Sequence, residues 1–267
     1  MTARPRPSFP ARLGSPASPG RVVPKHSVPE SMLQNPSPRS SVRPVTPVTH
    51  GLGLDSQAVR QNMVNKLIAD GIADARVLSA MGTIERHRFV DTALVNQAYE
   101  DTSLPIGLGQ TISKPGVVSR MAELLLNGRA DKLGRVLEIG TGCGYQAAVL
   151  SLLATEVYSI ERLRGLHDKA RENLRTLRLP NVHLLFGDGM VGFAKGAPYA
   201  AIIAAAGGEA VPQAWIEQLA VGGRLVAPVM SSERSKQALM VIDKTPEGLR
   251  QMVLETVHFV PLKSGIA

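Results

Sequence analysis

Apolar residues in the first half of the chain recur at helical spacing. Val59, Met63 and Leu67 are separated by polar residues and predict one face of an amphipathic helix. Gly71 is expected to end this helix, because glycine is common just beyond a helix C-terminus. A second helical stretch follows over Asp74–Met81.

The segment from residue 86 to residue 113 has no clear periodicity. It contains Pro105, Gly107 and Gly109, so we expect a loop with unusual backbone geometry. Pro115 is suited to the first position of a third helix, where its missing N–H is not needed. The apolar face of that helix consists of Val117, Val118, Met121, Leu124 and Leu125.

From Gly134 onward, short apolar runs alternate with helical stretches. Strands are predicted over 135–139, 156–161, 182–186, 200–206 and 223–229, and helices over 145–153, 163–177 and 212–219. Strands separated by helices favour parallel pairing and predict a doubly wound, mostly parallel α/β sheet. Two final strands, 239–243 and 253–260, have no helix between them. They should form an antiparallel edge hairpin that turns through Thr245–Gly248.

The first 50 residues differ in composition from the rest. They contain 11 of the 19 prolines, and their seven basic residues and one acidic residue give +6 of the formal net charge of +8. Proline-rich segments favour extended backbone and bury no core. We expect a disordered extension over 1–50, for which a start codon assigned too far upstream is an alternative origin. A single domain should cover 51–267, with a helical cap and active-site loop over 51–130 and an α/β core over 131–267.

The remaining charge of +2 weakens the case for a nucleic-acid partner. A nearly neutral domain lacks the concentration of basic residues that binds nucleic-acid phosphates. No run of 18 apolar residues is present, so we expect no membrane-spanning helix. The lone cysteine, Cys143, allows no internal disulfide, and no metal-ligand pattern is present. We predict a cytoplasmic monomer without a metal site, in which Cys143 fills space; a redox thiol at a helix N-terminus is the alternative.

The turn after the first predicted strand contains Gly140, Gly142 and Gly144. Ligands of open α/β sheets bind beyond the carboxyl ends of the strands, and glycines let the backbone approach them closely. A dinucleotide fingerprint would need a further glycine where Tyr145 stands. Glu138, two residues before the turn, would repel a pyrophosphate and suits a ligand with a positively charged amino group.

Acidic residues also stand at the ends of the next two strands. Glu161 lies 21 residues after Gly140, a spacing at which acidic residues commonly bind ribose hydroxyls. Gly187, Asp188 and Gly189 follow the third strand, where a side chain can reach an adenine amino group. These residues, with no lysine in the glycine turn, indicate an adenosine without phosphates, as in S-adenosylmethionine. The alternative is that each feature is structural, Asp188 being a turn former.

Four segments resemble the bacterial protein-L-isoaspartate O-methyltransferases. They are LPIGLGQTISKP (Leu104–Pro115), VLEIGTGCGYQAAVL (Val136–Leu150), GDGMVG (Gly187–Gly192) and FVPL (Phe259–Leu262). The resemblance extends from about residue 55 to the C-terminus and implies a Rossmann-like fold that uses S-adenosylmethionine. It implies proteins with L-isoaspartyl residues as substrates. Their free carboxylate is methylated, and the ester recloses to a succinimide that partly reopens to aspartate.

By the same resemblance, Ser113 is the active-site residue, and Gln110 and Thr111 help to close the cofactor pocket. The Ser113 hydroxyl can donate a hydrogen bond that orients the carboxylate nucleophile; the alternative role is a helix N-cap ahead of Pro115. A carboxylate is already ionised at neutral pH, so the transfer needs no general base. Alignment of the reactants should supply the catalysis.

The chain departs from the family pattern at a few positions, which are Gly116, Ala200, the run 204–212 and Lys263. They bear on substrate affinity more than on reaction type, because none lies in the glycine turn. Two other functions stay open. One is a methyltransferase of the same fold acting on a small molecule or nucleic acid, although no aromatic base-methylation motif follows the fourth strand. The other is a non-catalytic binding protein.

Overall fold

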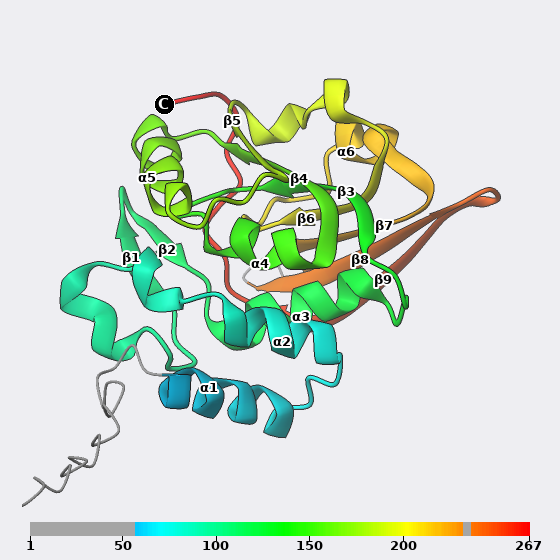
Figure 1. The fold of residues 1–267 in the computed structure, drawn as a ribbon. Helices are drawn as coiled ribbons and strands as arrows, with labels where there is room; N and C mark the ends of the chain where they lie inside the picture. Colours follow the sequence, from blue (N-terminus) through cyan, green and yellow to red (C-terminus); the bar gives the residue numbers. More distant parts are fainter. Residues whose placement is uncertain (1–56, 232–235) are drawn as a thin grey trace, which may run out of the picture. The chain divides into compact units, whose positions relative to one another are not determined.

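The computed structural model describes residues 57–231 and 236–267. The predicted extension over 1–50 and the predicted start of the domain at residue 51 lie outside the described residues. At the centre is a seven-stranded sheet with the order β5-β4-β3-β6-β7-β8-β9 (Figure 1). Its strands are β3 Leu133–Ile139, β4 Ala154–Glu161, β5 Val182–Phe186, β6 Tyr199–Ala204, β7 Leu219–Met230, β8 Gln237–Thr245 and β9 Gly248–Val257.

The sheet has the predicted mixture of parallel and antiparallel pairing. Strands β3 to β7 are parallel to their neighbours, whereas β8 pairs antiparallel with β7 and β9 antiparallel with β8. The last two strands form the expected edge hairpin, which projects from the sheet in Figure 1. Strand β3 has β4 on one side and β6 on the other, so the strand order reverses at β3. Ligands bind at such switch points in open α/β sheets.

Alternate side chains of the strands contribute to two hydrophobic cores. Val136 and Ile203 belong to the larger core, under the helices of the N-terminal half, and Leu137 and Ile202 pack with Trp215 on the other face. The helices are α1 Gln57–Ala69, α2 Ala75–Thr83, α3 Pro115–Leu126, α4 Tyr145–Leu153, α5 Arg164–Arg175 and α6 Gln213–Gln218. In the described part of the chain, no helix is long and apolar enough to cross a membrane.

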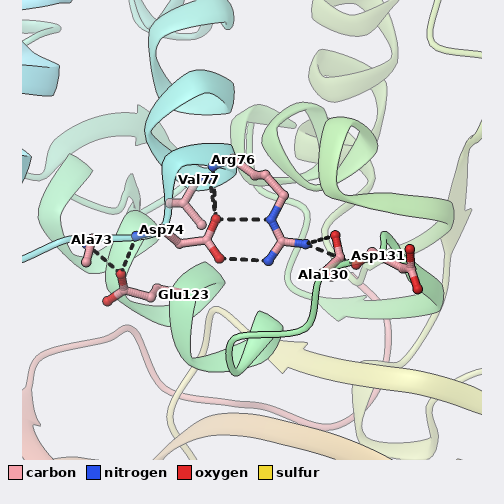
Figure 2. Close-up of polar contacts among 7 residues, drawn as sticks. All are labelled: Ala73, Asp74, Arg76, Val77, Glu123, Ala130 and Asp131. Carbon is pink, nitrogen blue, oxygen red and sulfur yellow. Dashed lines mark hydrogen bonds and ion pairs between the residues drawn. The ribbon is translucent and has the colours of Figure 1, made fainter.

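Charged side chains at the start of α2 form hydrogen bonds that hold it against the rest of the domain (Figure 2). Asp74 caps the helix by accepting hydrogen bonds from the backbone N–H groups of Arg76 and Val77. The Arg76 guanidinium pairs with Asp74 at 2.7 Å and donates to the backbone carbonyls of Ala130 and Asp131, each at 3.0 Å. These contacts bind α2 to the segment that leads into β3, so the helical cap and the sheet are linked directly.

The segment that was expected to be a loop contains regular structure. Two 3-10 helices, η1 Arg86–Phe89 and η2 Thr92–Gln97, precede an antiparallel hairpin of β1 Leu104–Gly107 and β2 Gln110–Ile112. The expectation of a loop was therefore wrong for this hairpin, whose strands are too short to show a period of two. Its turn has positive φ at three successive residues, Gly107, Leu108 and Gly109. Two further 3-10 helices, η3 Gly189–Val191 and η4 Ala194–Gly196, follow β5.

Candidate functional site

The glycine turn between β3 and α4 adopts backbone geometry that favours glycine. Gly140, Gly142 and Gly144 have φ values of +90°, +57° and +93°, a region in which side chains cause strain. A Cβ atom on Gly142 would also lie 3.2 Å from the side chain of Ile106. The turn therefore brings its backbone close to Ile106 of the β1–β2 hairpin, which lies 36 residues earlier in the sequence.

A cavity of about 450 Å³ opens between this turn, the hairpin and the C-terminal segment. Its wall includes Ala205 and Ala206, which directly follow β6, so it lies at the switch point between β3 and β6. Most of the residues that the sequence assigned to the site line it, namely Gln110, Thr111, Ser113, Gly140, Gly142, Glu161 and Gly189. Four other assigned residues are not part of the lining in the described structure, namely Glu138, Gly144, Gly187 and Asp188.

Glu161 ends β4 and is held in place by backbone donors. Its two carboxylate oxygens accept hydrogen bonds from the N–H groups of Gly142 and Leu163, each at 2.9 Å. The residue is 5% exposed and lines the cavity. Each carboxylate oxygen has a second lone pair, so Glu161 can still accept hydrogen bonds from two hydroxyl groups of a ligand.

Asp188 follows β5 and binds backbone groups on both sides. One carboxylate oxygen accepts from Met190 N at 2.8 Å, and the other accepts from Gly265 N at 2.6 Å. The C-terminal segment therefore lies against the position at which the sequence predicted adenine recognition. The next residue, Gly189, lines the cavity, and the Trp215 indole N–H donates to its carbonyl at 2.8 Å.

Glu138 lies behind the cavity wall and not on it. Its side chain is fully buried and accepts a hydrogen bond from the Ser159 hydroxyl on the neighbouring strand. Burial raises the pKa of Glu138 to about 8, because the charged form is poorly solvated there. Glu138 is therefore not placed to contact a ligand amino group directly, as the sequence had suggested. It could act on such a group only through another residue of the wall.

Ser113 connects β2 to α3 and lines the cavity with its partly exposed side chain. The N-cap of α3 is Lys114, so the alternative role of Ser113 as the cap is not borne out. Asp101 fulfils that function from a distant loop by accepting a hydrogen bond from Gly116 N at 2.6 Å and pairing with Lys114 at 3.0 Å. Within residues 57–231 and 236–267, the Ser113 hydroxyl makes no hydrogen bond, which leaves it available to a substrate.

The C-terminal FVPL segment forms another wall of the cavity. Gly207 N donates to Val260 O, and Leu262 N donates to Gly207 O, each at 2.8 Å. A Cβ atom on Gly207 would lie 2.5 Å from the Gln237 side-chain amide, which donates to Phe259 O, so a larger residue there would require this amide to shift. Lys263, directly after the FVPL segment, lines the cavity.

The sequence analysis did not identify several polar residues of the cavity wall, namely Thr141, Gln146 and Arg162. Gln146 is the second residue of α4, lines the cavity and is 8% exposed. The sequence feature that could have identified Gln146 is its position directly after the glycine turn, because the first residues of such a helix face the ligand.

The thiol of Cys143, in the glycine turn, is 2% exposed, and burial raises its pKa to about 11. A thiol that stays protonated is a poor nucleophile, so the redox alternative is not supported.

Comparisons with known proteins agree with this geometry. A family model described as protein-L-isoaspartate(D-aspartate) O-methyltransferase matches residues 58–267. A protein-L-isoaspartate O-methyltransferase of Methylibium petroleiphilum is 56% identical, with 98% of this chain and 97% of that protein covered. Another, from Burkholderia thailandensis, is 52% identical, with 96% of this chain and 76% of that protein covered.

Solved structures give the same fold. A protein-L-isoaspartate O-methyltransferase structure aligns with a TM-score of 0.70 and 28% identity, covering 78% of this chain and 67% of the other. A Plasmodium falciparum protein in complex with S-adenosyl-L-homocysteine aligns with a TM-score of 0.65 over 76% of this chain and 98% of the other. Its 22% identity supports the fold alone.

Proposed function

We propose that this chain, which belongs to the protein-L-isoaspartate(D-aspartate) O-methyltransferase family, methylates the free carboxylate of L-isoaspartyl residues in proteins with S-adenosylmethionine. The observation that carries the proposal is one cavity that combines the glycine turn, Glu161 and Ser113. The first two features suit an adenosine ligand, and the third suits a carboxylate substrate. A methyltransferase for small molecules or nucleic acid, or a non-catalytic binding protein, is not favoured.

The residues around the cavity fit S-adenosylmethionine. The cavity volume of about 450 Å³ is within the usual range for pockets that bind small ligands. Glu161 would accept hydrogen bonds from the ribose hydroxyls, and the backbone of Gly140 and Gly142 would lie against the ligand. No lysine or arginine stands in the turn from Gly140 to Tyr145, as expected for a nucleoside without phosphates. When bound, the cofactor supplies a methyl group on a positively charged sulfur.

The side chains of this protein would then position the nucleophile. The Ser113 hydroxyl would donate a hydrogen bond to one oxygen of the isoaspartyl carboxylate, leaving the other oxygen free to attack. Gln110 and Thr111, in the same hairpin, would close the cavity above the cofactor. No general base is required, because the carboxylate is ionised at neutral pH. Alignment of two reactants can contribute up to about 7–11 kcal/mol in favourable cases.

Other predictions for this chain also stay proposals. We expect a single domain over 51–267 that acts as a monomer in the cytoplasm, with damaged proteins rather than nucleic acid as partners. The lone cysteine suits a reducing compartment, and the net charge of +2 outside the first 50 residues does not favour phosphate binding. The exposed Lys263 at the cavity wall adds one positive charge where a substrate carboxylate would arrive.

The nature of the methylated bond tests the proposed function. The purified full chain is incubated with S-adenosylmethionine carrying a labelled methyl group and a synthetic isoaspartyl peptide. We expect label in the peptide that is released as methanol in mild base, because the product is a carboxyl methyl ester. Label that resists base, or a peptide that stays unlabelled, would contradict the proposal.

A further inference from the structure

Two buried polar atoms in and behind the cavity wall have no hydrogen-bonding partner among the described residues. They are Oε1 of Glu138 and Nε2 of Gln146. Buried polar groups nearly always have a partner, because an unsatisfied group loses its hydration without compensation. The fold therefore keeps two unsatisfied polar atoms next to the proposed cofactor site, which indicates that they find partners when a ligand is bound.

Gln146 connects Glu138 to the cavity. It lines the cavity, whereas Glu138 does not, and its amide is close enough to oppose the rise in the pKa of Glu138. The second carboxylate oxygen, Oε2, accepts from the Ser159 hydroxyl, which lies 2.6 Å from the hydroxyl of Thr141. Oε1 has no partner among the described residues, so it is the oxygen that the Gln146 amide would satisfy.

We infer that Gln146 binds the amino group of the cofactor and that Glu138 is the positioning residue that orients its amide. The inference rests on the proposed function. A glutamine amide has an accepting oxygen and a donating NH₂ group at opposite corners. When the NH₂ group donates to Glu138 Oε1, the amide oxygen points to the cavity and can accept a hydrogen bond from an ammonium group. The amino-acid end of S-adenosylmethionine carries such a group.

The protonation state of Glu138 would control this orientation. Burial raises its pKa, the charge of Glu161 raises it further, and Ser159 and Gln146 act in the opposite direction. A protonated Oε1 would donate to the amide oxygen and turn the NH₂ group toward the cavity, where it faces the ammonium unfavourably. Binding of the cofactor should therefore favour the ionised carboxylate, and affinity should fall as Glu138 becomes protonated at lower pH.

Two ligands separate this role from a structural one. S-adenosyl-L-homocysteine carries the amino-acid end, and 5′-methylthioadenosine has the same nucleoside and thioether without it. Gln146→Met keeps the side-chain length and removes the amide. By calorimetry, the variant should bind S-adenosyl-L-homocysteine roughly tenfold more weakly and 5′-methylthioadenosine with unchanged affinity. Gln213→Met is the control, because Gln213 is exposed, donates to Glu217 of its own helix α6 and lies outside the cavity lining; both affinities should stay unchanged.

The outcomes distinguish the inference from the proposed function. If Gln146→Met weakens both ligands equally, or neither, the inference is wrong while the proposed function stands. If the unaltered protein binds neither ligand, the proposed function itself fails, and the inference fails with it.

A second variant keeps the test decisive if Gln146→Met does not fold. Glu138→Gln removes the titrating group at nearly the same size. The unaltered protein should bind S-adenosyl-L-homocysteine roughly tenfold more weakly at about pH 6.5 than at about pH 8.5, and Glu138→Gln should show no such change. Binding of 5′-methylthioadenosine should be independent of pH in both proteins. Identical pH profiles of the two proteins with S-adenosyl-L-homocysteine would overturn the inference.

Discussion

Ser113 reaches the cavity because the chain changes direction around it. Ile112, directly before it, and Pro115, two residues after it, are buried and fix the end of β2 and the start of α3. Asp101 satisfies the backbone at the start of α3, so the serine side chain is not needed as a cap. The Ser113 hydroxyl has no hydrogen-bonding partner among residues 57–231 and 236–267, and it lines the cavity where the substrate carboxylate is proposed to bind.

Replacement of this hydroxyl should slow the reaction and spare cofactor binding. We expect Ser113→Ala to lower kcat/KM for an isoaspartyl peptide by roughly 10- to 100-fold, the effect of losing one hydrogen bond to a charged group. Affinity for S-adenosyl-L-homocysteine should change little. Ser151→Ala is the control, because that buried hydroxyl donates to a carbonyl of its own helix, Ala148 O, and lies outside the cavity lining. Unchanged turnover of Ser113→Ala would remove the residue from the mechanism.

Among the elements, those with strong periodicity were predictable and those fixed by distant contacts were not. The strands β3 to β7 and helix α4 matched the apolar pattern to within a few residues. The hairpin of β1 and β2 was missed, because its strands have four and three residues and its turn depends on positive φ at Gly107 to Gly109. Capping of α3 by Asp101 could not be predicted from the local sequence either, because Asp101 lies 15 residues before Gly116.

The anchor of α2 should make a measurable contribution to stability. Asp74→Ala removes both the N-cap and the partner of Arg76, and we expect a loss of about 1–2 kcal/mol in the free energy of unfolding by urea denaturation. The exposed Asp70, just after α1, provides the control, since its replacement by alanine should change stability by less than about 0.5 kcal/mol. Equal effects of the two substitutions would contradict the anchoring role.

The same anchor should depend on pH in a defined direction. Arg76 holds the pKa of the Asp74 carboxyl below its ordinary value of 3.8, so the folded state favours the ionised form. The contribution to stability is therefore present above that ordinary value and is lost as the pH falls through the lower pKa of the folded state. The stability difference between the unaltered protein and Asp74→Ala should shrink in this acidic range. A difference that grows on acidification would refute the assignment.

For the whole molecule, the proposed chemistry depends on the sheet and not on the first 50 residues. The switch point between β3 and β6, the hairpin and the C-terminal segment together enclose the cavity, and no candidate site residue precedes Gln110. A chain that begins at Gly51 should therefore have the same turnover per molecule as the full chain. A lower kcat in the shortened protein would place a functional contribution in the extension.

Substrate selection tests the proposed function more directly than any other measurement. An equal mixture of two peptides that differ only in L-isoaspartate or L-aspartate at one position competes for labelled S-adenosylmethionine. We expect kcat/KM for the isoaspartyl peptide to exceed that for the aspartyl peptide by at least roughly 100-fold. Equal labelling of both peptides, or labelling of neither, would contradict it.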